Sequence, residues 1–540
     1  MRQSAQRTGQ IWRQRLAVFG LCWLWLTACA CWPIAHGYVS DAALLRITHV
    51  LTVVSAPTLR IEDFRLLYPH LALLPLLPLS GLPVFWLGLA PYLVSGAFGA
   101  VLLTWWNSQL RDKHYSGTDR ALLLALVATH PMFVWGVTSG VQGGLSLLLF
   151  YTLYLGTVRV IREADARAFI MLGAIFGVYF FVDERTLFLY LAFLPLLPMI
   201  APRKMLQASP SSLYLIVSMP LLLSLLAWVV YLAFVLNEGP LSYINQPGVS
   251  FRGAWHFLAD MAWLRSYGGQ FFLPLGVTFL LMLLAYPAVL WLIWRARRHA
   301  TLMRDVEAMP IHLAVATAMA TVTYFLAQPA DMLYLLSAGL MAALVLMPRE
   351  TGRRHRIQLF AVLLLSALGA GLALQWKPTT DAVRWQQAWR GQLLPEYFSG
   401  DEALGRWLNA HRQPTMLDEH AAFRAVVARG DAHGLLLTSM KEFKRAMQGD
   451  ELHVAQVVVR DPDHNQHDRT GYGDQLFSER LPDSITWHFG KLYRDGMNGY
   501  QLVYDDAHWR VYRRIGMEAQ QLETVPEMEY SLALPMGATP

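Results

Sequence analysis

The segment from residue 36 to residue 82 brings together side chains that can do chemistry. It carries three acids and three arginines, in the order Asp41, Arg46, Arg60, Glu62, Asp63 and Arg65. Carboxylates transfer protons, and guanidinium groups bind anions through paired hydrogen bonds. The segment is too polar at its start to cross a bilayer, yet too apolar for an ordinary soluble loop. Its placement must therefore depend on the apolar elements around it.

Composition indicates a polytopic membrane protein. The chain has 540 residues, of which 55% are hydrophobic and 15% are charged, against roughly 25% charged residues in soluble domains. Residues 1–375 hold 26 Lys and Arg against 15 acids, whereas residues 376–540 hold 18 against 23. The basic excess lies beside the membrane spans, so nucleic acid is excluded as a partner and membrane lipids are expected. The three cysteines lie in the first apolar run, which leaves no disulfide framework for the C-terminal part.

Eleven apolar runs are long enough to be candidate spans, at about 16–35, 83–108, 120–138, 142–160, 168–182, 186–201, 211–236, 271–294, 311–326, 332–347 and 357–375. With the N-terminus inside, the inner connections hold 20 Lys and Arg and the outer connections hold six. The positive-inside rule then predicts a cytoplasmic N-terminus and an extracytoplasmic C-terminal domain. Counting 66–80 as a further span reverses this bias, so we interpret it as a helix in the outer interface.

The expected fold is mainly α, a polytopic bundle followed by an extracytoplasmic α/β domain. Its parts are a cytoplasmic tail (1–15), a transmembrane module (16–375) with outer loops at 36–82 and 237–270, and the α/β domain (376–540) with a loose end. Residues 41–55 fit an interfacial amphipathic helix with an apolar stripe of Leu44, Ile47, Leu51 and Val54. In the tail, 403–412 and 440–449 are predicted helices, and 433–439, 453–460, 499–506 and 508–514 are predicted strands. The last two strands form a predicted hairpin.

Several acids fall at the predicted outer ends of spans, where charge is costly. They are Asp41, Glu62, Asp63, Asp183, Glu184, Glu238, Asp260 and Asp331. Two interpretations stand: hydrated turn residues, or a ring around a cavity that opens to the external face.

A resemblance to a known family rests on the order of weak motifs. After the basic tail, the first span and the early acid comes LYPHLALLPLLPLSG (67–81), followed by THPMFVWGVTSGVQGGLSLLLF (129–150) and GAIFGVYFFVDERTLFLYLAFLPLL (173–197). This order resembles the GT-C membrane glycosyltransferases, which include protein mannosyltransferases, the lipid A aminoarabinose transferase and the oligosaccharyltransferase catalytic subunit. The resemblance covers residues 10–200 well and the rest only in architecture. It implies a multi-pass enzyme of the bacterial inner membrane.

The resemblance also implies roles for particular residues. Such enzymes move a sugar from a polyprenyl-phosphate donor to a glycan, lipid or protein acceptor, which needs a base for the acceptor hydroxyl and cations for the phosphate. Asp41 matches the early acid of the first outer loop and is the expected general base; a helix N-cap or first-turn acid is the alternative. Arg185 is the expected phosphate clamp, although local pairing with Asp183 or Glu184 explains it equally well. Further candidates for the phosphate are Arg65 and His70. The supporting residues are Glu62, Asp63, Tyr68, Gln142, Asp183, Glu184 and Asp331.

The chain departs from the family pattern at Gln142, where many relatives carry an acid that sometimes binds a metal. An amide is neither a base nor a strong ligand, so no metal ligand is assigned and a divalent cation is left open as a cofactor. A second possible cation site is the sequence DPDHNQHD (461–468). Its spacing does not match a calcium loop, and a solvated polar loop is the simpler interpretation.

Two other classes of function remain open. A transporter of lipid-linked glycans predicts charges within the spans and an internal repeat, and the sequence shows neither. A non-catalytic assembly protein of a glycan pathway, with a degenerate transferase core, is favoured by Gln142 and disfavoured by Asp41 and Arg185.

Overall fold

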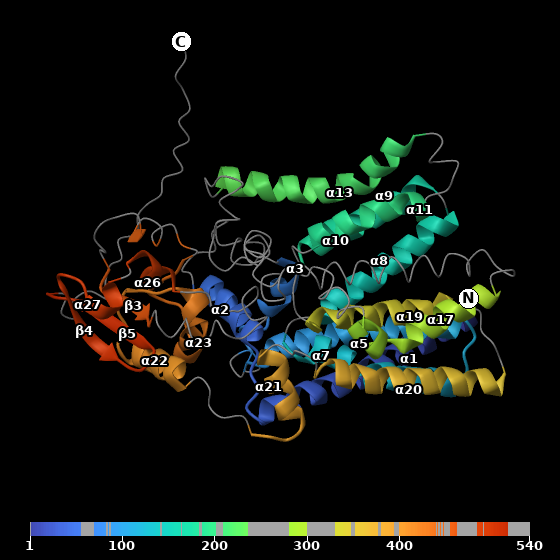
Figure 1. The fold of residues 1–540 in the computed structure, drawn as a ribbon, viewed down its shortest axis with the longest axis horizontal. Helices are drawn as coiled ribbons and strands as arrows, with labels where there is room; N and C mark the ends of the chain where they lie inside the picture. Colours follow the sequence, from blue (N-terminus) through green and yellow to red (C-terminus); the bar gives the residue numbers. More distant parts are fainter. Residues whose placement is uncertain are drawn as a thin grey trace, which may run out of the picture.

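The computed structural model describes a mainly helical chain that ends in a small mixed sheet (Figure 1). The described residues are 2–55, 70–82, 85, 88–140, 143–163, 165–182, 186–200, 209–235, 280–299, 330–346, 352–375, 380–393, 399–438, 440, 443, 446–447, 454–461, 483–489 and 491–516.

The helical part contains four described helices that are long and apolar enough to cross a membrane, and a bent pair makes a possible fifth span. Its elements are α1 (Arg2–Ala35), α2 (Asp41–Ser55), α3 (His70–Leu73), η2 (Leu74–Leu76), α5 (Ala90–Asp112), α6 (Gly117–Ala128), α7 (Pro131–Thr138), α8 (Gly143–Glu163), α9 (Ala166–Phe180), α10 (Thr186–Phe193), η3 (Leu194–Leu196), α11 (Leu197–Ile200), α13 (Pro210–Val230), η4 (Tyr231–Val235), α17 (Pro287–His299), η5 (Ala330–Leu335), α19 (Leu336–Leu346), α20 (Arg353–Ala373) and α21 (Thr380–Trp389). By their length and composition these helices support the membrane class. The count of eleven spans stays a prediction, since the run 311–326 lies outside the described residues.

Proline positions explain where several apolar runs break. The run 120–138 is divided into α6 and α7, whose axes differ by 63°. His130 has an extended backbone, and Pro131 occupies the first position of α7, where its missing N–H costs nothing. The run 186–201 is likewise divided into α10, η3 and α11, with Pro195 inside η3.

Small residues let the long helices approach closely. Hypothetical Cβ atoms would overlap Ser95 O from Gly144 of α8, and Val217 O from Gly173 of α9. Close backbone contact at glycine is a usual way for membrane helices to associate, because lipid gives them little hydrophobic drive to pack. Trp106 of α5 adds a long-range link, donating from Nε1 to Met341 O at 2.9 Å.

The C-terminal part is a five-stranded mixed sheet with helices around it. Its strands, in the order β2-β1-β3-β5-β4, are β1 (Thr415–Met416), β2 (Leu435–Leu436), β3 (Gln456–Arg460), β4 (Tyr500–Asp505) and β5 (Trp509–Arg514). Its helices are α22 (Ser399–Ala410), α23 (Glu419–Arg429), α26 (Ser484–His488) and α27 (Leu492–Asp495). Strands β1, β2 and β3 are mutually parallel, and β5 is antiparallel to both β3 and β4.

The predicted mixed α/β domain is confirmed, including α22, β3 and the β4–β5 hairpin. Within the predicted strand 433–439 only Leu435–Leu436 pairs, and β1 and α23 were not predicted. Much of the predicted helix 440–449 and the C-terminal residues 517–540 lie outside the described residues.

Helix α2 lies beside α23, between the helical part and the sheet (Figure 1). Its bounds match the predicted helix, and of the predicted stripe Ile47 and Leu51 are buried while Val54 is 50% exposed. Ile47, Val50 and Val53 pack in one cluster with Leu73 of α3 and residues of η2 and α5, and Val427 of α23 packs against it. Protein therefore covers α2 on more than one side, which corrects the prediction of a one-faced interfacial helix.

Two further segments differ from simple expectation. Residues 70–76 form only the short α3 and η2, because Pro75 and Pro78 cannot continue an α-helix; the prediction of one surface helix over 66–80 is corrected to that extent. Helix α21 falls within the predicted C-terminal domain, yet its Ala382, Trp385 and Ala388 belong to the core of the helical part. The compact α/β unit begins at α22.

Candidate functional site

The connection between α1 and α2 is held from several sides by buried hydrogen bonds. The Tyr38 hydroxyl donates to Ser139 O at 3.0 Å, and the Ser40 amide donates to the Tyr92 hydroxyl at 2.9 Å. Ser40 O accepts from the Leu44 amide, so Ser40 is the N-cap and Asp41 opens the first turn of α2. The start of α2 is thereby fixed to α5 and to the end of α7.

Gly140 allows the turn after α7 to pack directly on this connection. Its φ of +85° lies in the left-handed region, and a Cβ there would stand 2.8 Å from Ser40 Cβ. The Gly140 carbonyl accepts a hydrogen bond from Arg46. Gly140 therefore brings the first loop and the turn before Gln142 into contact, as the candidate site requires.

Asp41 forms an ion pair with Arg424 of α23. Only 16% of the Asp41 side chain and 4% of the Arg424 side chain are exposed. The Arg424 guanidinium also lies 5.4 Å from the centre of the Phe423 ring. The expected general base is therefore in contact with the C-terminal domain, close to 400 positions away in the sequence.

A second acid and a third arginine reach the same place from α21. Asp381 accepts a hydrogen bond from Ser40 Oγ at 3.1 Å. Arg384, 8% exposed, and Asp381 both act electrostatically on Tyr38 and Tyr92. We define the charged cluster as Asp41, Arg46, Asp381, Arg384 and Arg424. These five residues come from α2, α21 and α23, and the ion pair between Asp41 and Arg424 joins the first of these helices to the last.

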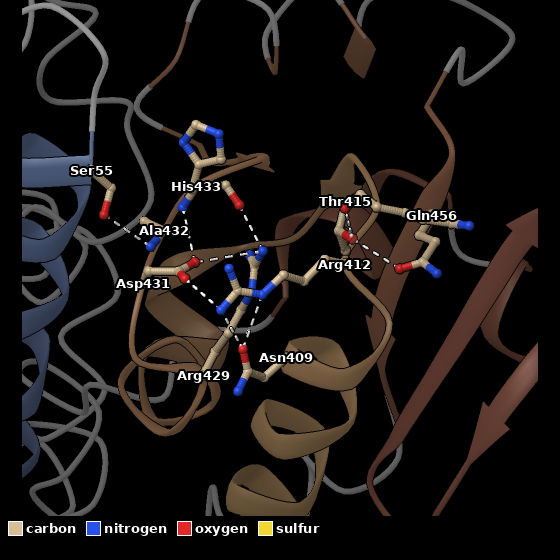
Figure 2. A network of polar contacts seen from close by, with 10 residues as sticks. Ser55, Asn409, Arg412, Thr415, Arg429, Asp431, Ala432, His433 and Gln456 are labelled. Atoms are coloured by element: carbon tan, nitrogen blue, oxygen red, sulfur yellow. Dashed lines mark hydrogen bonds and ion pairs between the residues drawn. The ribbon is translucent and has the colours of Figure 1, made fainter. Parts of the chain in front are cut away.

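Two more hydrogen bonds join α2 to the C-terminal domain. Thr48 Oγ1 donates to Phe423 O at 3.1 Å, and Ser55 Oγ accepts from the Ala432 amide at 3.2 Å. Figure 2 shows the second of these beside a polar network centred on Asp431. Asp431 is paired with Arg412 at 2.9 Å and with Arg429 at 3.6 Å. The contact of α2 with the C-terminal domain is thus polar at Asp41, Thr48 and Ser55, and Val427 adds an apolar contact to it.

Of the residues predicted for the site, Asp41 is placed with its side chain. It occupies the first turn of α2, as the alternative interpretation stated, and it also belongs to the charged cluster. His70 begins α3 and Asp331 lies in η5, and only their backbones are described. The others lie outside the described residues: Glu62, Asp63, Arg65, Tyr68, Gln142, Asp183, Glu184 and Arg185.

The sequence did not point to Asp381, Arg384 or Arg424. Each lies on a short helix whose charged residues look like an ordinary solvated face. Their contacts with residues 38–41 depend on how α21 and α23 fold back, and no local pattern carries that information. One sequence signal could have pointed to them: a charged residue on an otherwise apolar face of a helix. Arg424, which lies near Phe423 and Val426, is an example.

Within the described ranges, no group of three or more His, Cys, Asp or Glu side chains could hold a metal ion. Of the possible cation site at 461–468, only Asp461 is described, and its amide donates to His508 O at 2.9 Å.

The C-terminal domain buries a separate pair of carboxyl groups. Asp483 accepts from the Arg460 amide at 3.0 Å and from the Thr486 hydroxyl, and Asp418 accepts from the Ser484 amide at 2.8 Å. These bonds fasten the start of α26 to the ends of β1 and β3. Burial, together with the charge of Asp418, raises the pKa of Asp483 to about 6.

The raised pKa predicts a pH-dependent stability. Because the folded protein holds this proton more tightly than the unfolded chain, Asp483 adds stability below its ordinary value of 3.8, and this contribution is lost as the pH rises to about 6. Calorimetry of the purified protein at pH 4.5 and pH 7.5 should show that loss. Asp418→Asn removes the neighbouring charge and should reduce it, whereas the exposed control Asp505→Asn should not. An equal loss in all three proteins would contradict the assignment.

Comparison with known proteins does not assign the chain to a family. The chain matches none of the protein-family models against which it was scanned, and a search of curated proteins finds no significant match.

Proposed function

We propose that the chain is a GT-C-type membrane glycosyltransferase, which transfers a sugar from a polyprenyl-phosphate donor to a glycan, lipid or protein acceptor. The observation that carries the proposal is the position of Asp41. The acid that the family resemblance selects lies in a desolvated cluster with three arginines, where four separate parts of the chain meet.

The proposed reaction uses the residue types of this cluster. The Asp41 carboxylate accepts the proton of the acceptor hydroxyl as that oxygen bonds to the sugar C1. The bond between C1 and the phosphate oxygen breaks, and the polyprenyl phosphate leaves with the bonding electrons. Guanidinium groups stabilise the negative charge that grows on the leaving phosphate.

Cations for the donor phosphate come from two sources in the proposal. Arg185, Arg65 and His70 keep the roles that the resemblance implies. Arg384 and Arg424 of the charged cluster add two buried guanidinium groups near Asp41. Purified protein mixed with radiolabelled polyprenyl-phosphate sugars and membrane acceptors should release polyprenyl phosphate and label an acceptor. Donor that stays intact with every sugar offered would count against the proposal.

We also propose that the chain spans the bacterial inner membrane eleven times, with its N-terminus in the cytoplasm and its C-terminal domain outside. The charge bias of the connections supports this orientation. In spheroplasts, protease added from outside should therefore degrade the C-terminal domain, while a tag on residue 1 survives. Protection of the C-terminal domain until the membrane is opened would contradict the orientation.

An accessory role in glycan assembly is the second candidate, and the Asp41–Arg424 ion pair favours it. A carboxylate held by a buried guanidinium is a weaker base. In the accessory role the pair joins two domains and takes part in no reaction. The two functions differ in one observable: only the transferase consumes the donor.

A further inference from the structure

The polar network around Asp431 contains a buried arginine that is only partly hydrogen-bonded. Arg429, the last residue of α23, is 4% exposed. Its Nη2 donates to His433 O at 2.6 Å. Nε and Nη1 of the same guanidinium are also buried, and among the described residues they have no hydrogen-bond acceptor. A buried donor without an acceptor costs free energy, which a ligand that brings acceptor oxygens would recover.

Arg429 shares one carboxylate with a second arginine (Figure 2). Asp431 Oδ2 lies 2.9 Å from Arg412 Nη2, and Asp431 Oδ1 lies 3.6 Å from Arg429 Nη2. The second contact is longer than a hydrogen bond. Within the described ranges, no other acid forms an ion pair with either arginine. Two guanidinium groups and one carboxylate together keep one positive charge.

The electrostatic surroundings of Arg429 agree with this count. Burial lowers the pKa of its guanidinium, the Asp431 carboxylate raises it, and the Arg412 charge lowers it. Arginine nevertheless stays charged in proteins. The C-terminal end of α23 supplies a partial negative charge of about half an electron, which does not balance the excess. An added anion would therefore stabilise both arginines.

The network reaches the surface on the side of Arg412. Half of the Arg412 side chain and about a quarter of the Asp431 side chain are exposed. Asn409 Oδ1 accepts from Arg412 Nε at 3.1 Å and from Arg412 Nη2 at 2.6 Å, which fixes the guanidinium. Arg412 Nη1 makes no hydrogen bond to any described residue. Arg412 thus offers an accessible donor, and Arg429, which one hydrogen bond holds, can turn to offer a second.

We propose that Arg412 and Arg429 form a binding site for a phosphate group, next to Asp431. One phosphate oxygen accepts from Arg412, and another accepts from the free donors of Arg429. The two oxygens of a carboxylate lie in one plane and suit a single arginine. Phosphate presents oxygens in several directions, so it can bridge two guanidinium groups that come from the ends of different helices.

The proposed site is separate from Asp41, and the inference does not rest on the proposed transferase. It adjoins the end of α2, where Ser55 Oγ accepts from the Ala432 amide. A phosphate there belongs either to a lipid headgroup or to a soluble molecule. Both sources present the same singly or doubly charged oxyanion to the two arginines.

The site predicts opposite effects of two substitutions on the binding of inorganic phosphate. Arg412→Met removes the accessible donor, so binding should weaken by about tenfold. Asp431→Asn removes the acid that repels the phosphate, so binding should tighten by about tenfold. The control is Arg406→Met, which removes an exposed arginine of α22 that pairs with Glu402 and should change binding by less than about twofold. Titration calorimetry on the full-length protein in phosphatidylcholine nanodiscs measures each affinity.

The buried arginine is tested by Arg429→Lys, which keeps the positive charge and loses the additional donors. Phosphate binding should weaken by about threefold or more. Hydrogen exchange shows whether this variant is folded. Unchanged phosphate binding by the folded variant would overturn the participation of Arg429. The Arg412 and Asp431 variants test the site independently of it.

A second arm identifies the source of the phosphate. The proteins are released from nanodiscs that mix phosphatidylglycerol with phosphatidylcholine, and the bound lipids are counted by native mass spectrometry. If the ligand is a lipid headgroup, the wild type should retain phosphatidylglycerol and Arg412→Met should lose most of it. If the ligand is soluble, retention should be equal in the two proteins while inorganic phosphate follows the pattern above.

Three results would overturn the site. The first is absent phosphate binding together with equal phosphatidylglycerol retention in all variants, as expected if the two arginines only fasten the loop before β2. The second is equal binding of acetate at matched ionic strength, because the site would then not distinguish phosphate from other anions. The third is an equal effect of Arg406→Met and Arg412→Met, which would reduce the binding to general surface charge.

Discussion

Replacing Asp41 by Asn is expected to lower the rate of sugar transfer by about 100- to 10,000-fold, the range that a positioned general base contributes. Asn has nearly the same shape and cannot accept the proton of the acceptor hydroxyl. The rate should be measured as release of polyprenyl phosphate by purified protein at saturating donor. Asp381→Asn is the matched control: it changes the other acid of the cluster and should cost less than tenfold.

The ion pair with Arg424 complicates that result, because Asp41→Asn also removes the partner of a buried guanidinium. The double variant Asp41→Arg with Arg424→Asp separates the two effects. It restores an ion pair between α2 and α23 while placing no carboxylate at residue 41. We expect most of the lost stability to return and the transfer rate to stay at the level of Asp41→Asn. Recovery of transfer in the swapped protein would show that the ion pair alone matters.

Replacing Arg424 by Met is expected to lower the free energy of unfolding by about 3 kcal/mol. This is the low end of the roughly 3–5 kcal/mol found when one partner of a buried pair is removed, since 16% of the Asp41 side chain still reaches water. Denaturant-induced unfolding in detergent micelles measures the effect. Arg412→Met is the control, because Arg412 pairs with Asp431 while half exposed and should cost at most about 1 kcal/mol. Equal losses of unfolding free energy in the two variants would mean that the buried ion pair contributes no more to stability than the exposed one.

The local sequence pattern was enough to predict those helices and strands whose apolar residues recur at a regular spacing within the element. The helix at Asp41–Ser55 and the hairpin of β4 and β5 were predicted because their periodicity is contained in the element itself. The same reasoning failed for β1, which has only two residues, and for α23, whose backbone departs from helical angles at Ala422. The burial of α2 was also missed, because it depends on α23 lying against it.

The candidate site follows the same division. Asp41 was found because a carboxylate in an apolar segment is conspicuous and because the motif order resembles a family. Asp381, Arg384 and Arg424 are brought to it by contacts across more than 300 positions. The net charge of such a cluster is a tertiary property. Whether Asp41 is paired with a guanidinium depends on where α23 lies, and no local pattern in the sequence predicts that.

The most direct measurement is donor consumption by purified wild-type protein, Asp41→Asn and the charge-swapped variant side by side. Each is given the same radiolabelled polyprenyl-phosphate sugar, and hydrogen exchange confirms that each is folded. The proposal predicts release of polyprenyl phosphate by the wild type, and about a hundredth of that rate or less in both variants. Equal rates in the three folded proteins, or no donor consumption by the wild type, would contradict it.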